Sequence, residues 1–251
     1  AWRLLGLVDA AGSPADPGLL LAQGLEPQFA LHEAADRAGR VDGPLSAGRA
    51  RRAILVVLMT QEGALPDDAG PDDEAPGIPP EAQFEAFGGL AEVRKLAPDA
   101  VIGVLVPRLG QGTERDGAMA RYGAELGVPA LGVAVFDVLA AHKRLREHPE
   151  VDPARVFLLG LGPAGVPALH AAVLVGEGAP VLLAGAPVTL FYDGPGPDDR
   201  PGPFLPWPPA LLAPLPAGAS LDPWLAARAL GDRVRWLDPR DGANQPFTAN
   251  L

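Results

Sequence analysis

Cysteine is absent from this chain of 251 residues. The absence excludes disulfides, thiolate metal sites and a cysteine nucleophile together, although it leaves the cellular compartment open. Serine is scarce as well, since it occurs only at Ser13, Ser46 and Ser220, each in an expected loop. No apolar stretch approaches the roughly 20 residues that a membrane-spanning helix requires. We therefore expect no membrane span and few candidates for nucleophilic catalysis.

Positive charge is also low. The chain has 20 lysines and arginines against 31 aspartates and glutamates, so its net charge is −11 and its pI is near 4.8. This excess of acid argues against nucleic acid or an anionic membrane as a partner. A cationic partner is compatible with it, while solubility is the simpler explanation. Because the first residue is Ala1, we expect something upstream to have been removed or left out, and export after removal of a signal is one of the alternatives.

Apolar runs separated by turn residues alternate with helical stretches along the chain. Strands buried on both faces of a sheet have such continuous apolar sequences. The pattern predicts strands at Trp2–Val8, Phe29–His32, Ala53–Met59, Ala100–Val106, Val156–Leu159, Val181–Ala184 and Val234–Leu237. It predicts helices at Phe84–Leu96, Met119–Leu126, Val133–Arg146 and Asp222–Leu230. This alternation indicates one α/β domain over residues 1–251, with a mostly parallel sheet.

Two loops are rich in proline. Residues 66–80 are also acidic, but the carboxylates do not have the spacing of an EF-hand, so we expect an exposed loop and not a calcium site. These carboxylates are Asp67, Asp68, Asp72, Asp73 and Glu74. Residues 193–218 contain Phe204 and Trp207 among many prolines and leucines, which indicates a structured excursion or cap and not a linker.

The segment from Arg155 to Leu174 reads RVFLLGLGPAGVPALHAAVL, an apolar strand, a glycine-rich turn and a helix of small residues. This is the outline of a nucleophile elbow, in which a strained turn presents a serine. The serine position of G-x-S-x-G falls on Gly162, and Ala164 takes the place of the second glycine. Glycine tolerates the strained turn, so the backbone can persist without a nucleophile. A phosphate-binding turn is the alternative, but the G-x-G-x-x-G spacing is incomplete and Pro163 removes one N–H donor.

Two phrases carry a family resemblance. HPEVDPARVFLLGLGPAG (148–165) and ALGDRVRWLDPRDG (229–242) resemble the α/β-hydrolase superfamily, in its dienelactone-hydrolase and acetyl-xylan-esterase-like branch. The resemblance implies a three-layer sandwich, an oxyanion-hole loop at Thr60–Gly63, and a triad acid at Asp241 or, next, Asp238. In that family a histidine follows after another helix and strand, whereas this sequence stops at Leu251. The resemblance therefore implies a degenerate site, with vestigial positions Gly162 and Asp241 or Asp238, and a sheet without its last strand.

The remaining polar residues provide no replacement site. All four histidines lie on the wrong segments for the triad, and they lack H-x-x-x-H spacing, so we expect no metal and no cofactor. They are His32, His142, His148 and His170, and the threonines Thr60, Thr113, Thr189 and Thr248 offer nothing stronger. Trp207, Trp224 and Trp236 could line a ligand cleft, but core or cap packing is commoner for tryptophan.

The sequence thus favours a non-catalytic α/β-hydrolase-fold domain, a pseudoenzyme that acts as a scaffold, subunit or ligand-binding module beside a catalytic relative or in a larger assembly. If the last strand is missing, the strand that ends at Asp238 is an open edge, which a neighbouring chain or tandem domain would cover. The alternative is a carboxylic-ester hydrolase with a nucleophile elsewhere or a histidine outside this sequence. A small-molecule binding protein that uses the vestigial cleft is a third reading.

Overall fold

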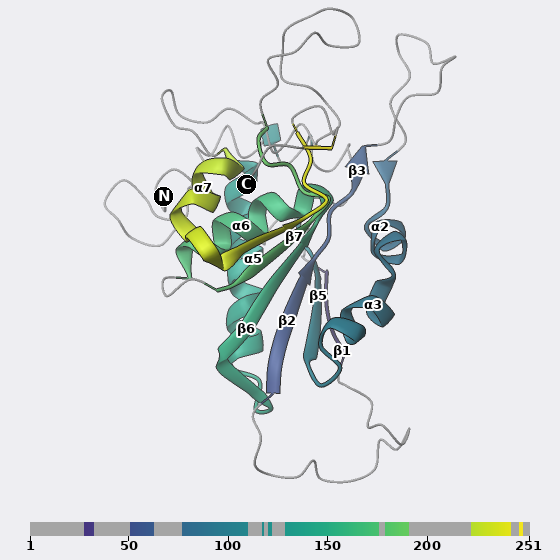
Figure 1. Ribbon diagram of the computed structural model, residues 1–251, viewed down its shortest axis with the longest axis vertical. Helices are drawn as coiled ribbons and strands as arrows, with labels where there is room; N and C mark the ends of the chain where they lie inside the picture. The colour runs from purple at the N-terminus through teal and green to yellow at the C-terminus, as the bar shows by residue number, and fades with distance from the viewer. Residues whose placement is uncertain are drawn as a thin grey trace, which may run out of the picture.

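A six-stranded sheet forms the centre of the molecule (Figure 1). The computed structural model describes residues 28–32, 51–62, 77–109, 117, 120–121, 129–175, 179–190, 222–241 and 246–247. The strands are β1 (Gln28–His32), β2 (Arg51–Val57), β5 (Val101–Val106), β6 (Val151–Leu161), β7 (Val181–Ala184) and β8 (Val234–Leu237). Their spatial order is β1-β5-β2-β6-β7-β8, with β1 antiparallel to β5 and every other neighbouring pair parallel. The predicted α/β class with a mostly parallel sheet is confirmed.

Helices cover both faces of this sheet, which gives three layers. Helices α5 (Ala130–Arg146), α6 (Gly165–Leu174) and α7 (Pro223–Leu230) lie on one face, and α2 (Pro80–Phe87) and α3 (Gly89–Leu96) lie on the other (Figure 1). Short strands β3 (Gln61–Glu62) and β4 (Gly77–Ile78) form a separate antiparallel pair. Among the described helices, none combines the length and apolar character needed to cross a membrane.

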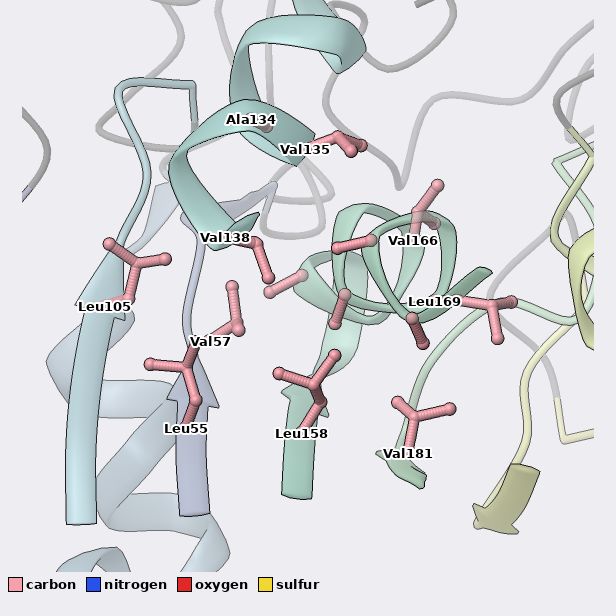
Figure 2. Packing of buried hydrophobic residues seen from close by; sticks show 14 of the residues in the cluster. Leu55, Val57, Leu105, Ala134, Val135, Val138, Leu158, Val166, Leu169 and Val181 are labelled. Carbon is pink, nitrogen blue, oxygen red and sulfur yellow. The ribbon is translucent and has the colours of Figure 1, made fainter. Parts of the chain in front are cut away.

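The continuous apolar run of β2 is explained by burial on both sides. Leu55 and Val57 pack toward α5 and α6 together with Leu158, as Figure 2 shows. The alternate residues, Val56 and Leu58, belong to the second core on the α2 and α3 side. Burial of each such side chain contributes about 1.5–3 kcal/mol relative to leaving it exposed. The core therefore lies on both faces of the central strands, and it fixes where those strands end.

The helical character predicted for Phe84–Leu96 is confirmed, but it is divided between two helices. The chain forms two helices there, because Gly88 and Gly89 both adopt left-handed conformations, with φ of 101° and 57°. A side chain at either position would be strained, whereas glycine adopts positive φ at no steric cost. Helical periodicity on the two sides of this glycine pair conceals the break in the sequence.

Other elements agree with the prediction in kind and differ in length. Strand β6 begins at Val151 and not at Val156, because four residues bulge out where its register with β2 shifts. Helix α5 starts at Ala130, before the predicted Val133. Asp222 is the N-cap of α7, where its carboxylate accepts a hydrogen bond from the backbone N–H of Trp224 at 3.1 Å.

Several predicted features lie outside the described residues. They are the strand Trp2–Val8, the acidic part of the loop at 66–80, the excursion at 193–218 and, apart from Ala120 and Arg121, the helix Met119–Leu126.

Burial of a histidine in α5 makes stability depend on pH. His142 is 5% exposed, and burial, assisted by the charge of Arg146, lowers its pKa from 6.5 to about 4. The unfolded chain therefore takes up a proton at a higher pH than the folded chain, so stability falls as pH falls from about 6.5 toward 4. Between about pH 7 and 4.5 we expect protonation of this residue to lower the free energy of unfolding by about 2–3 kcal/mol. Urea unfolding at both pH values should show that loss in the wild type and not in His142→Leu; equal losses would contradict it.

Candidate functional site

The turn after β6 has the geometry that the elbow motif predicts. Strand β6 ends at Leu161, and Gly162 follows with φ of 55°, in the left-handed region. A single 3-10 turn over 162–164 then leads directly into α6. The chain thus reverses from strand to helix within a few residues at the carboxyl end of a central strand. Gly162 thus has a positive φ in a strand-to-helix turn, as the nucleophile-elbow motif requires of its central residue.

Close approach between β6 and α6 makes this turn possible. A Cβ on Gly160 would lie 2.5 Å from the Cα of Gly165, a distance that no relaxed structure allows. A Cβ on Gly165 would overlap the Cβ of Ala186, which follows β7. Only hydrogen atoms fit between these backbones. The second small residue that the turn requires is Gly165, one position beyond the Ala164 of the sequence motif.

The turn lacks two groups that a nucleophile elbow uses, a nucleophilic side chain and a backbone N–H after it. Gly162 has no side chain to attack a carbonyl. Pro163 follows it, and proline has no backbone N–H. In a nucleophile elbow the N–H of the residue after the nucleophile is one of the two oxyanion-hole donors. Pro163 therefore removes a donor from an oxyanion hole as well as from a phosphate-binding turn.

The positions proposed for the triad acid lie on a neighbouring part of the same edge. Strands β6, β7 and β8 are consecutive in the sheet, and Asp238 directly follows β8. The N–H of Arg240 donates to the carbonyl of Ala186 at 3.0 Å, and the N–H of Val188 donates to the carbonyl of Arg240 at 2.8 Å. Ala186 therefore packs against the elbow helix and also holds the segment after β8.

Asp238 and Asp241 differ in their surroundings. Asp238 is exposed, has φ of 51° and forms an ion pair with Arg240. Aspartate tolerates the left-handed region better than most residues, so this strain is modest. Asp241 is half-buried, three residues further on. Both carboxylates thus lie beyond the carboxyl end of β8, where the resemblance implies the triad acid. The first of them, Asp238, is paired with Arg240.

The described histidines lie away from these carboxylates. His142 is buried in the second half of α5, and His148 is in the turn into β6, at the opposite end of the strands from the elbow. His170 is buried within α6, where its Nδ1 donates to the carbonyl of Val166 at 2.8 Å. His32 belongs to β1, at the other side of the sheet from β8. No described histidine occupies the position of a triad base.

In the described part of the chain, no hydroxyl group replaces the serine of the elbow motif as a nucleophile. The Oγ1 of Thr189 donates to the Asp222 carboxylate at 2.7 Å, and Thr60 is nearly buried after β2, where the expected oxyanion-hole loop begins. Ser13, Ser46, Ser220, Thr113 and Thr248 lie outside the described residues, as do Trp207 and Gly63. Within the described ranges, no three His, Cys, Asp or Glu side chains gather as metal ligands.

A buried ion pair joins the segment after β5 to helix α5, and it was not predicted from the sequence. Arg108, after β5, and Asp137, in α5, are 1% and 2% exposed. The Asp137 carboxylate accepts from the backbone N–H of Arg108 at 2.9 Å and from its Nη2 at 2.7 Å. Burial raises the pKa of Asp137, and the hydrogen bonds and charge of Arg108 oppose that rise. The pair fixes the chain after β5 to α5. An aspartate within an apolar helix face was the only signal in the sequence.

Proteins similar to this chain are found among solved structures. No protein-family model matches the chain, and the search of curated proteins finds no match. Esterase 2 of Thermogutta terrifontis, phosphonylated by cyclosarin, is similar at 16% identity and a TM-score of 0.40, over 88% of this chain and 80% of that chain. Est1E of Butyrivibrio proteoclasticus, with ferulic acid, is similar at 8% identity and a TM-score of 0.37, over 65% and 50%. A structure from the metagenome-derived lipolytic enzymes LipS and LipT gives 19% identity and a TM-score of 0.35, over 71% and 54%.

Because β6 and α6 lie so close together, we expect alanine substitutions at two strand glycines to change the free energy of unfolding by different amounts. Gly160→Ala would force a Cβ against backbone, which we expect to destabilise the fold by about 3 kcal/mol. Gly103→Ala in β5 meets only the ends of the Leu145 and Phe29 side chains, at 3.1 Å, so a change within about 1 kcal/mol is expected. Urea unfolding measures both variants. Equal losses of stability would show that the two backbones are not in close contact.

Proposed function

We propose that this chain is a non-catalytic domain of α/β-hydrolase-like architecture, which acts as a scaffold, subunit or ligand-binding module. The observation that carries the proposal is the pair Gly162–Pro163. The turn keeps the left-handed conformation of an elbow but provides neither the attacking oxygen nor the adjacent N–H donor. Two consecutive residues thus remove two separate contributions to ester hydrolysis.

The magnitudes of these contributions make the loss severe. Removal of one oxyanion-hole donor typically costs about 10²–10³ in kcat. Removal of the serine of a triad costs about 10⁶. The alternative, a carboxylic-ester hydrolase, needs a hydroxyl and an imidazole together, and the described residues do not place such a pair at the carboxyl edge. We take residues 1–251 as one domain with an excursion at 193–218, because the main described strands belong to one sheet.

Exposed apolar residues near β8 support the scaffold or subunit role. Strand β8 is the outermost described strand on its side of the sheet. Leu237 is 51% exposed, and Trp224 and Leu225 on α7 are 40% and 48% exposed. Among the described residues, the chain pairs with itself on this side just beyond β8, where the N–H of Phe247 donates to the carbonyl of Pro239 at 2.8 Å. We infer that a neighbouring chain or a tandem domain covers this edge. Trp236 packs against the core, which weighs against its lining a ligand cleft.

Hydrolysis of nitrophenyl acetate tests the loss of catalysis. We expect the wild type to hydrolyse the ester at the rate of buffer. Gly162→Ser should do the same, because Pro163 provides no oxyanion donor and no described histidine would activate the new hydroxyl. Gly231→Ser, at another left-handed glycine, is the control for chance acylation. Turnover by the wild type at ordinary enzyme rates, about 1–10³ s⁻¹, would establish the ester hydrolase instead.

Light scattering after size exclusion tests the open edge. An isolated chain with an uncovered apolar edge should associate as its concentration rises. Leu237→Lys should reduce that association, since a lysine on an edge strand opposes pairing with another chain. A wild type that stays monomeric over the full concentration range would refute the inference about β8.

A further inference from the structure

We propose that the amino-terminal end of the sheet is a docking surface for an acidic protein segment. This surface, the basic end, consists of Arg51 and Arg52 of β2, Arg155 of β6, and Lys143, Arg144 and Arg146 in the last turn of α5. It lies at the opposite end of the strands from the elbow, so the proposal does not depend on the catalytic state of that turn.

Short connections gather these residues in space. The N–H of His148 donates to the carbonyl of Leu145 at 3.1 Å, and the N–H of Val151 donates to the carbonyl of His148 at 3.0 Å, so α5 turns directly into β6. The N–H of Arg51 then donates to the carbonyl of Glu150 at 2.7 Å, which joins the start of β2 to the same turn. Figure 1 shows β2 and β6 starting together at the lower end of the sheet.

The bulge in β6 pushes one arginine outward. Arg51 pairs with Val151 and Ala53 pairs with Val156, so four residues of β6 stand opposite Arg52 alone. Pro153, Ala154 and Arg155 in this bulge are exposed. The Asp152 carboxylate accepts from the N–H of Ala154 at 3.0 Å and thereby fixes the turn of the bulge. Arg52 and Arg155 are thus exposed residues of neighbouring strands at the same end of the sheet.

Charge at this end is opposite to the charge of the whole chain. Among the described residues, the six cations of the basic end stand beside four carboxylates, Asp99, Glu147, Glu150 and Asp152, whereas the chain as a whole carries −11. Glu150 pairs with Arg51 at 3.7 Å, and Glu147 pairs with Lys143 at 3.8 Å. Arg144 lies over the Phe29 ring at 5.3 Å. Within the described residues, the exposed Arg52, Arg146 and Arg155 have no ion pair.

Helix electrostatics explains only part of this cluster. Cations in the last turn of a helix are stabilised by its dipole, which accounts for Lys143, Arg144 and Arg146. The dipole gives no reason for the strand arginines Arg52 and Arg155. A local excess of cations in an acidic protein attracts an acidic partner and orients its approach, because potentials of opposite sign steer encounter.

The charge pattern favours a protein segment over nucleic acid. Nucleic acid presents a uniform, dense line of phosphates, which the carboxylates interspersed within the basic end would repel. An acidic peptide has discrete carboxylates, each of which can accept two parallel hydrogen bonds from an arginine. The three arginines without ion pairs provide such positions.

Binding of a labelled decaglutamate peptide, followed by fluorescence anisotropy, tests the proposal. The wild type should bind at about 20 mM salt and lose at least about tenfold in affinity at about 300 mM, because exposed charge pairs are screened. Arg146→Glu with Arg155→Glu should weaken binding at low salt about tenfold or more. Arg228→Glu with Arg235→Glu changes the net charge equally at exposed positions on α7 and β8, and should change affinity less than about threefold.

Three outcomes would overturn the proposal. One is the absence of peptide binding by the wild type at low salt. Another is equal weakening by the two double variants, which would reduce the effect to net charge. The third is tighter binding of a single-stranded oligonucleotide or of anionic vesicles than of the peptide. Circular dichroism of both double variants confirms folding, and Arg146→Gln with Arg155→Gln repeats the test without introducing new carboxylates.

Discussion

Contact between the backbones of β6 and α6 is the constraint on which the site depends. A side chain on Gly160 would meet the backbone of Gly165, and a side chain on Gly165 would meet Ala186. This contact holds the helix directly over the end of the strand, which forces Gly162 into its left-handed conformation. Gly165 also packs against Ala186, whose carbonyl holds the segment after β8 through Arg240. One contact thus organises the carboxyl ends of three neighbouring strands.

The same constraint explains how the turn can keep its backbone conformation without a nucleophilic side chain. Stability at the turn requires hydrogen atoms at Gly160 and Gly165, and it makes no demand for a nucleophile at Gly162. Glycine there relieves strain that a serine would impose, and proline next to it suits the first turn of a helix. The residues that suit the fold at these two positions are therefore ones that provide neither a nucleophilic side chain at 162 nor a backbone N–H at 163. A proposed role in scaffolding or assembly is consistent with a turn that keeps its conformation without these groups.

The sequence predicted the elements whose cause is local. Strands β2, β5 and β7 are continuous apolar runs buried on two faces, and the elbow follows from its glycines. Features that depend on distant residues were not predictable. The Arg108–Asp137 pair joins positions 29 residues apart, and neither side chain signals its partner. The contact of Gly165 with Ala186 depends on β7 lying beside β6, which the motif alone does not specify.

The strands thus separate two surfaces of different character, the empty elbow at one end and the basic end at the other. The central claim, that no activated nucleophile exists, is tested most directly by intact-mass spectrometry after treatment with a fluorophosphonate. The account predicts an unchanged mass for the wild-type chain. A stoichiometric adduct on any serine or threonine would contradict it.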